Sequence, residues 1–330
     1  MVLGMSVRAQ RGATGGRRSR GSLVISIDAE LGWGVHDLRP LPETWKRRVA
    51  ASRQAWLQLL ELFETYRIPA TWAIVGHLLV ADGQQFHDRH PLSGDWFEQA
   101  RRSLAESPSR WVGSDLVEAI RSSSVEHEIG SHSFSHVVFD EVTEEVARAE
   151  CQFAREVGQL YGYDFRSFVF PRNAVAHVSA LSEAGFECFR GHPPPRLPAI
   201  PGLRGGALLA GAVTGLFGPP LVSPTTTDEG LVNVPASMFL GGYRGNLSSV
   251  LATVDDDPAV RLAKQGIDRA CDTQGLLHLW LHPGDLTDNA YIRRVRRVLS
   301  YAARQRDSRD LRIEKMGDVA RRVTSRGIHA

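Results

Sequence analysis

The chain has 330 residues, enough for one large domain or for two smaller ones. Hydrophobic residues make up 42% of it and charged residues 23%, which is typical of a globular protein, and the formal net charge of +2 gives no reason to expect nucleic-acid binding. The three cysteines, Cys151, Cys188 and Cys271, form no CxxC pair, and an odd number cannot close a disulfide framework. A reducing compartment is therefore expected.

The first 21 residues are basic, with five arginines and no acid. Because they lack the apolar stretch of a secretory signal, we expect a disordered tail in a cytoplasmic protein, with a basic arm that contacts anionic lipid as the alternative. No run of the sequence reaches the ~20 apolar residues needed to span a bilayer. The apolar segment 207–222 is interrupted by glycines and prolines. We interpret it either as a lid over the active site or as a segment that makes peripheral contact with a membrane.

Strand-like and helix-like segments alternate along the rest of the chain. Short β-branched or apolar runs predict strands, and apolar residues at helical spacing predict helices. In chain order we expect strands at 23–28, 70–75, 126–131, 167–170, 187–190, 231–235, 276–281 and 311–313. Between and after them we expect helices at 44–66, 115–123, 143–161, 178–184, 259–273, 290–304 and 318–323.

This alternation predicts an α/β fold with a parallel sheet, as a single distorted (β/α) barrel of about seven to eight strands. Since no linker divides the chain, residues 22–330 are expected to form one domain. Residues 77–113 and 192–230 would be insertions in it. Loops of that length in a compact domain are more often functional than accidental.

Polar residues follow several of the predicted strands. In parallel β/α folds, the residues that act in catalysis lie at the C-terminal ends of the strands. The polar residues at these positions are Asp28, Glu30, His132, His136, Arg172, Asn173 and His282. Acids, imidazoles and a guanidinium would therefore meet at one rim of the barrel, where we expect the active site.

The HxxxH pair His132 and His136 carries the strongest signal. Two histidines four residues apart lie on one face of a helical turn and can bind one cation. Two histidines and one carboxylate leave positions open for water and substrate. Asp28 or Glu30 can supply the carboxylate, and the other then stays free as a base. An iron oxygenase site uses the same ligand types, but the β/α pattern does not suggest an oxygenase fold.

Histidine and tryptophan residues alternate with leucines along the predicted strand 276–281 and at residue 282. His278, Trp280 and His282 share one face of this strand. His282 is nearest the mouth of the barrel and is the candidate acid, whereas His278 is expected to support the site or the core. Trp33 and Trp280 are expected to stack on a flat substrate face such as a sugar. His77 also ends a strand, but we expect it to be structural.

Four segments together resemble the polysaccharide deacetylase (NodB-homology) family. They are SIDAELGWG at 26–34, HEIGSHSFSH at 127–136, FVFPRN at 168–173 and LHLWLHPGDL at 277–286. The resemblance covers residues 22–320, and the histidine motif is its most specific part. It implies a distorted (β/α) barrel and a divalent metal, commonly zinc, with cobalt, nickel or manganese as alternatives. It also implies hydrolysis of an N-acetyl or related amide on a sugar.

The resemblance also implies roles for individual residues. His132 and His136 match the metal-binding histidines of the family, and Asp28 matches its catalytic base. Arg172 resembles the arginine that orients this base. His282 matches the late histidine that acts as the acid.

The sequence departs from the family pattern at two places. Ala29 stands where many members have a second aspartate, so we assign Glu30, the next residue, as the third metal ligand. Pro171 precedes Arg172, whereas prolines in the family often follow this arginine. Arg166 is therefore a second candidate for the orienting role.

The sequence thus predicts a metal-dependent amide hydrolase. Because we expect a cytoplasmic protein, a biosynthetic precursor such as a lipid-linked sugar, a nucleotide sugar or a glycoside is a better substrate hypothesis than a wall polymer. Asn173 is expected to contact this substrate. Two alternatives are a deformylase or cyclic amide hydrolase of the same superfamily, and an inactive barrel that binds carbohydrate. The sequence leaves the oligomeric state open.

Overall fold

The computed structural model describes residues 20–38, 43–81, 83–92, 95–194, 218–241, 257–286 and 289–327. Most of the predicted N-terminal tail and residues 207–217 of the apolar segment therefore lie outside the described residues. Within the described ranges, no helix combines the length and the hydropathy that crossing a membrane requires.

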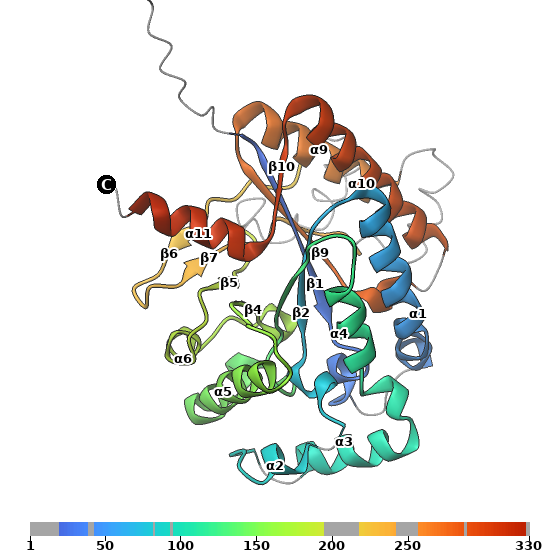
Figure 1. Cartoon of the computed structure of the whole chain (residues 1–330), viewed down its shortest axis with the longest axis vertical. Helices are drawn as coiled ribbons and strands as arrows, with labels where there is room; N and C mark the ends of the chain where they lie inside the picture. Colours follow the sequence, from blue (N-terminus) through green and yellow to red (C-terminus); the bar gives the residue numbers. More distant parts are fainter. Residues whose placement is uncertain are drawn as a thin grey trace, which may run out of the picture.

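A single sheet runs through the centre of the molecule (Figure 1). The strands of this sheet are β1 (Ser22–Ala29), β2 (Thr71–Ile74), β3 (Glu128–Ser131), β4 (Ser167–Val169), β5 (Cys188–Arg190), β6 (Thr225–Thr226), β7 (Val232–Asn233), β8 (Met238–Phe239), β9 (Leu276–Leu281) and β10 (Arg312–Glu314). All of the pairings are parallel except that of β6 with β7. Every residue of β1 is buried, as expected for a strand covered on both faces.

The sheet curves into a distorted barrel. Its strand order is β6-β7-β5-β4-β3-β2-β1-β9-β8, and β10 pairs with β1. The segment from β7 to β8 changes partner, because β7 pairs with β5 and β8 pairs with β9. This segment therefore joins the two ends of the curved sheet. The predicted α/β barrel is confirmed, although β6 and β8 have only two residues each, too few to show a period in the sequence.

Helices cover the outside of the sheet. They are α1 (Glu43–Tyr66), α4 (Ser114–Arg121), α5 (Glu144–Leu160), α6 (Val178–Glu183), α9 (Pro258–Thr273), α10 (Asn289–Arg309) and α11 (Met316–Gly327). Helix α5 begins after Thr143, whose hydroxyl accepts the N–H of Val146, and α9 begins after Asp257, whose carboxylate accepts the N–H of Ala259. Short 3₁₀ helices follow several strands: η1 (Trp33–Val35), η2 (Gly76–Leu79), η3 (Pro108–Arg110), η4 (Phe139–Glu141), η5 (Pro171–Asn173) and η6 (Pro283–Asp285).

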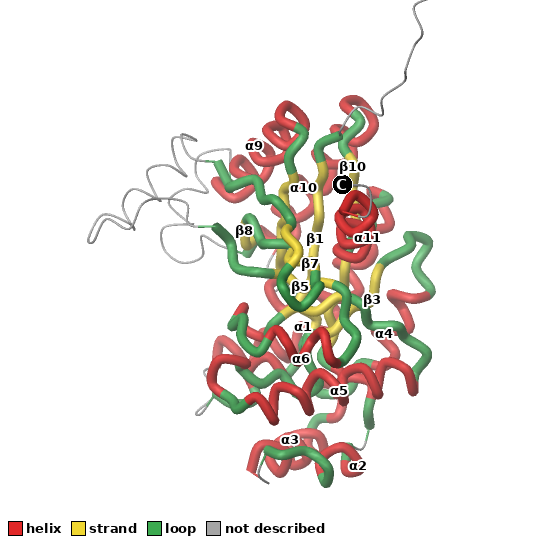
Figure 2. Tube along the Cα trace, turned by 90° about the vertical axis from the view of Figure 1, so that its left-hand side faces the viewer, coloured by secondary structure: helices red, strands yellow, loops and turns green. Residues whose placement is uncertain are grey.

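The insertion at 77–113 contains two helices that the periodicity did not reveal. Helices α2 (Gln84–His87) and α3 (Asp95–Glu106) lie beyond the C-terminal ends of the central strands, next to α5 (Figures 1 and 2). Phe86 and Phe97 of this insertion contact Phe134, which lies between the two histidines of the HxxxH motif. The insertion is therefore fixed against the rim where the site was predicted.

Candidate active site

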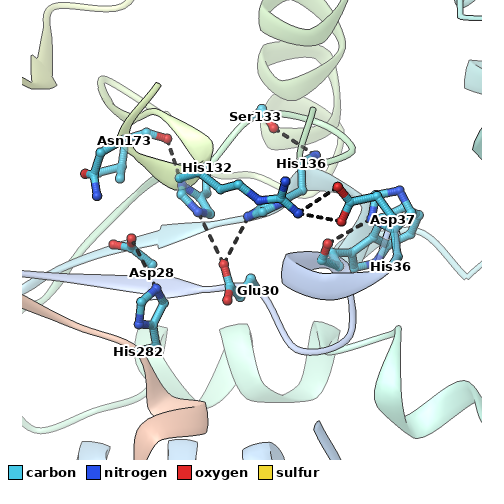
Figure 3. A network of polar contacts seen from close by, with 12 residues as sticks. Asp28, Glu30, His36, Asp37, His132, Ser133, His136, Asn173 and His282 are labelled. Atoms are coloured by element: carbon cyan, nitrogen blue, oxygen red, sulfur yellow. Dashed lines mark hydrogen bonds and ion pairs between the residues drawn. The ribbon is translucent and has the colours of Figure 1, made fainter. Parts of the chain in front are cut away.

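The structure brings the three predicted metal ligands together at the C-terminal ends of β1 and β3 (Figure 3). Glu30 Oε2 lies 3.1 Å from His136 Nε2 and 3.5 Å from His132 Nε2. One ligand atom from each residue lies within 4.8 Å of the other two. Ligand atoms around a tetrahedral zinc with bonds of about 2.0–2.2 Å are separated by roughly 3.3–3.6 Å. The spacing of these side chains therefore fits a divalent cation.

The hydrogen bonds of His132 support the same interpretation. Its Nδ1 lies 2.7 Å from the carbonyl oxygen of Val169, at the end of β4. A carbonyl oxygen only accepts, so Nδ1 carries the proton and Nε2 directs a lone pair towards Glu30. Two acceptors then face each other across 3.5 Å. A cation between them would turn this unfavourable arrangement into coordination.

The backbone of the histidine motif is a tight turn, which corrects the helical turn expected from the HxxxH spacing. Ser133 has φ 67° and His136 has φ 64°, both in the left-handed region. The N–H of His136 donates to Ser133 Oγ at 2.9 Å. This turn directs both imidazoles towards Glu30 (Figure 3).

Glu30 follows β1 directly and is oriented by the next turn. Leu31 has φ 47°, and the chain then enters η1. A Cβ at Gly34 would overlap the Glu30 carboxylate, so only glycine leaves room for it. Burial raises the pKa of Glu30, but the charge of His282 and the contacts of the carboxylate with the imidazoles of His132 and His136 outweigh it and hold this pKa well below its usual range. Glu30 is therefore ionised.

Asp28 is held by an arginine that the sequence analysis did not assign to the site. Arg190 Nη1 and Nη2 donate to the two oxygens of Asp28 at 2.6 and 2.7 Å. Arg190 ends β5 and is 0% exposed. Burial raises the pKa of Asp28, but the charge and hydrogen bonds of Arg190 outweigh it and lower this pKa. Asp28 is therefore ionised and has a fixed orientation.

The predicted pairing of Arg172 with Asp28 is wrong. Arg172 has φ 53° and its Nη2 donates to both oxygens of Asp37 at 2.6 Å. This left-handed turn carries the side chain to Asp37, in the loop after β1, and not to Asp28. The second candidate, Arg166, pairs at the surface with Asp164 and does not reach the site either. The sequence did offer one indication of Arg190, because it is a charged residue at the end of a predicted strand.

His282 lies beside Asp28 and is oriented by a second acid. Its Nδ1 donates to Asp285 Oδ2 at 3.1 Å, and its Nε2 lies 3.7 Å from Asp28 Oδ2. Burial lowers the pKa of His282, but the negative charges of Glu30, Asp285 and Asp28 raise it to about 9. A cation at Glu30 would offset part of that rise. The imidazole thus presents an N–H close to the base.

The three predicted substrate contacts have different surroundings. The prediction that Trp33 contacts substrate is wrong. Trp33 is only 1% exposed and its Nε1–H donates to the carbonyl oxygen of Trp111, so it offers no face to a ligand. The oxygen of Asn173 accepts from Nε and Nη2 of Arg190 at 3.1 and 2.8 Å. Trp280 is partly exposed, and the Arg190 guanidinium lies 4.5 Å from its ring centroid. Asn173 and Trp280 therefore both support Arg190.

His278 and His77 have the structural surroundings that were expected. His278 is fully buried, with Nε2 2.9 Å from Ser26 Oγ, and Ser26 Oγ also accepts from Arg190. His77 lies 2.7 Å from His87, between Nε2 atoms, and its ring packs on Trp33. Neither imidazole faces the cluster of Glu30.

Two cavities adjoin the cluster. A small one of about 20 Å³ is lined by Glu30 and His282. A larger one of about 250 Å³ lies along the loop after β1, and Lys46 and Arg110 stand on its wall. Val35 and Val49 line both cavities, so the larger one neighbours the smaller one, and only the smaller one is lined by residues of the polar cluster.

Residues 49–189 match the family model described as polysaccharide deacetylase. The matched part contains the two histidines of the cluster, but it begins after Asp28 and Glu30 and ends one residue before Arg190. A search of curated proteins found no match.

Solved structures with the same fold cover nearly the whole chain. A protein assigned as a polysaccharide deacetylase from Mycobacterium smegmatis has a TM-score of 0.60 at 13% identity, covering 94% of this chain and 93% of that one. Another so assigned, from Pseudomonas aeruginosa PAO1, has a TM-score of 0.56 at 14% identity, with coverages of 91% and 90%. PuuE allantoinase has a TM-score of 0.57 at 15% identity, with coverages of 91% and 89%. Together, the family match over residues 49–189 and this shared fold confirm the resemblance of the chain to the polysaccharide deacetylases.

Proposed function

We propose that this chain is a metal-dependent hydrolase that removes an N-acetyl or similar acyl group from a sugar or glycan precursor. The observation that carries the proposal is the convergence of Glu30, His132 and His136 beside Asp28 and His282. Two histidines and a carboxylate form a ligand set typical of catalytic zinc. When bound there, a divalent cation would polarise the scissile carbonyl group and lower the pKa of water.

Asp28 acts as the general base in this mechanism. Its carboxylate takes a proton from the attacking water while Arg190 holds it from the other side. Because Arg190 keeps Asp28 ionised, the base is ready over a wide pH range. Asn173 fixes the guanidinium through two hydrogen bonds and so supports the base indirectly.

His282 acts as the general acid. Its Nε2–H donates a proton to the amine nitrogen as the C–N bond breaks, and the amine leaves as neutral product. Asp285 accepts from Nδ1 and so fixes the orientation of the ring. Asp28 and His282 lie side by side, so the proton removed from water and the proton given to the amine are handled within one small region.

The cavity of about 250 Å³ beside the cluster supports a substrate of about the size of one sugar unit. Its wall carries the cations Lys46 and Arg110, one acid, Glu106, and both polar and apolar side chains. A precursor such as a nucleotide sugar or a lipid-linked sugar bears phosphate, which these cations would favour. The same base and ligands would also serve a cyclic amide, so that class belongs in the same substrate screen.

The test begins with the metal content of the purified protein. We expect near-stoichiometric divalent metal, most readily zinc, that is lost in the double variant His132→Ala/His136→Ala. The loaded protein is then screened for acetate or formate released from N-acyl sugars and their phosphorylated forms. The control is Arg166→Ala, which changes a surface arginine outside the site.

Each outcome bears on the proposal. Metal binding with acyl release that the double variant lacks would support it. A wild-type protein that takes up no zinc, cobalt, nickel or manganese would refute the hydrolase mechanism and favour a carbohydrate-binding barrel. Ring opening of a cyclic amide without acyl release would keep the mechanism and replace the substrate class.

A further inference from the structure

A buried carboxylate that the proposed mechanism does not use lies behind the histidine turn. Glu150 is in the middle of α5 and is 0% exposed. No lysine or arginine is among the partners that the structure gives it, so its charge is balanced by hydrogen-bond donors alone. A buried acid of this kind is costly unless its position serves a purpose.

Three of these donors belong to the turn between the two metal-binding histidines. Glu150 Oε2 accepts the backbone N–H of Phe134 at 3.0 Å and that of Ser135 at 2.8 Å. The hydroxyl of Ser135 donates to the other oxygen, Oε1. The same turn contains the left-handed residues Ser133 and His136, a conformation that non-glycine residues avoid unless they are held. Glu150 thus holds the part of the chain that sets the direction of both imidazoles.

The fourth contact of Glu150 comes from the insertion at 77–113. His90 Nε2 lies 3.1 Å from Glu150 Oε1. The Nδ1 atom of His90 accepts the N–H of Leu92 at 3.1 Å, so Nε2 carries the hydrogen, on the side of the ring next to the carboxylate. In addition, Trp96 Nε1 donates to Ser135 Oγ at 3.1 Å. The insertion and α5 therefore meet at the outer side of the histidine turn, where Figure 2 shows α2 and α3 next to α5.

We infer that Glu150 is a positioning residue for the metal centre, and that the insertion at 77–113 supports it through His90 and Trp96. Glu150 contacts neither a ligand atom nor the base, and acts only through the backbone of the turn. The insertion is then part of the outer layer that fixes the site, in addition to any contact it makes with substrate. This inference rests on the proposed function, since it concerns the same metal ligands.

Electrostatics agree with this geometry. Burial raises the pKa of Glu150, but the hydrogen bonds from His90 and Ser135 outweigh it and lower this pKa. The acid is therefore ionised, and charged acceptors form stronger hydrogen bonds to backbone N–H groups than neutral ones. Glutamine has the same shape but would place an N–H₂ group against one of these donors.

The first test uses metal-free protein and measures amide hydrogen exchange. In Glu150→Gln we expect the amides of Phe134 and Ser135 to exchange at least about tenfold faster than in the wild type. The matched control is Glu128→Gln. Glu128 lies in β3 and also accepts several hydrogen bonds, from Thr71, Ser167 and the N–H of Gly317, but at the opposite end of the strand. Exchange at Phe134 and Ser135 should stay unchanged in this control at temperatures where both variants are folded.

The second test measures metal affinity by competition with a chelator, and the absorption spectrum of the cobalt-loaded protein. Glu150→Gln should weaken metal binding by about 10- to 100-fold and change the cobalt spectrum, because outer-layer partners typically have this effect. His90→Phe removes the donor to Glu150 and should weaken binding in the same direction. His90→Gln keeps an N–H donor and should recover most of the affinity.

The two tests separate this inference from the proposed function. Faster exchange in Glu150→Gln supports the positioning role even if the wild-type protein were to bind no metal, in which case only the proposed function fails. Unchanged exchange and unchanged metal affinity in a folded Glu150→Gln protein would overturn the inference while leaving the proposed function intact. Equal losses of affinity in Glu150→Gln and Glu128→Gln would also overturn it, because they would indicate general destabilisation.

Discussion

The two ends of the barrel both contain carboxylates that are buried or partly buried, but the partners of these acids differ. At the N-terminal ends of the strands, Glu128 accepts hydrogen bonds from hydroxyl and backbone groups. Glu314 accepts from Ser22 Oγ and from Arg322. Every one of these partners is a donor, so the acids join strands and α11 into a closed network. This end of the barrel is built for stability.

At the C-terminal ends, the acids face groups that can exchange protons or bind a cation. Glu30 lies against two imidazole nitrogens, one of which has its lone pair directed at it. The carboxylate of Asp28 accepts hydrogen bonds from Arg190 on one side and lies near His282 on the other. Burial alone therefore does not show whether an acid has a structural or a catalytic role. The identity and protonation of its hydrogen-bond partners show this.

The largest expected effect is at Asp28. Asp28→Asn keeps the size of the side chain but removes the base, and we expect acyl release to fall by about 10²- to 10⁴-fold, measured as kcat/KM. The control is Glu314→Gln at the opposite end, which should lower the stability and leave kcat/KM nearly unchanged. An Asp28→Asn protein within tenfold of the wild type would assign the base to another residue.

A smaller effect is expected at Arg190. Arg190→Lys cannot form both hydrogen bonds to Asp28, and we expect kcat/KM to fall by roughly 10- to 100-fold. The pKa of Asp28 should rise, because burial raises it and lysine, although it keeps the charge, cannot replace both hydrogen bonds that oppose this rise. The acidic limb of the pH–rate profile should then move to higher pH. A limb that stays in place, in a folded variant, would separate Arg190 from the base.

The next effect concerns the space beside Glu30. Gly34→Ala would displace the Glu30 carboxylate, and we expect metal affinity to fall by about tenfold, measured by chelator competition. The control is Gly230→Ala, because Gly230 has φ 84° in a turn away from the site and its replacement costs stability alone. Equal metal affinities in the two variants would show that Glu30 is not a ligand.

The smallest effect is on stability, through histidines buried as neutral groups. Burial lowers the pKa of His278 to about 3 and that of His77 to about 3. The unfolded chain, with an ordinary pKa near 6.5, binds protons more readily than the folded protein once the pH falls below that value. The free energy of unfolding should therefore decrease from pH 6.5 towards pH 3, by up to about 1.4 kcal/mol per pH unit for each histidine.

Urea unfolding of metal-free protein at pH 7, 6 and 5 measures this slope. His278→Gln removes one of the two groups and should make the slope shallower, even if the variant is less stable at pH 7. A slope that stays the same would mean that His278 titrates alike in the folded and unfolded states.

Much of the rim could be predicted from the sequence, because it depends on where strands end. Asp28 and Glu30 stand at the end of an apolar run that is buried along its whole length, and His132 follows a short strand. The barrel brings the ends of these two strands together. The pairing of Asp28 with Arg190, instead of Arg172, could not be predicted in this way. It depends on a left-handed φ at Arg172, a property of the local backbone that no periodicity encodes.

The surroundings of single side chains were also beyond the sequence. Trp33 was predicted to stack on a sugar, but His77 and Trp111 of the insertion at 77–113 pack on its ring, and the carbonyl oxygen of Trp111 accepts its N–H. Glu150 lies within a regular amphipathic helix, and only the fold places it against the histidine turn. Long-range packing determines these surroundings, and the residues next to a side chain in the sequence do not indicate it.

Strand β1, which carries Asp28 and leads into Glu30, pairs with β2 and with two strands from the far end of the chain. Ser22 of β1 pairs with Leu276 of β9 and with Arg312 of β10. Contacts across such long separations in sequence are slow to form, because a large loop must close before they are made. During synthesis on the ribosome, β1 can pair with β2 early, but its pairing with β9 waits for almost the whole chain to emerge. Chains that end before β9 would also lack His282, so they would carry the histidine turn without a complete centre.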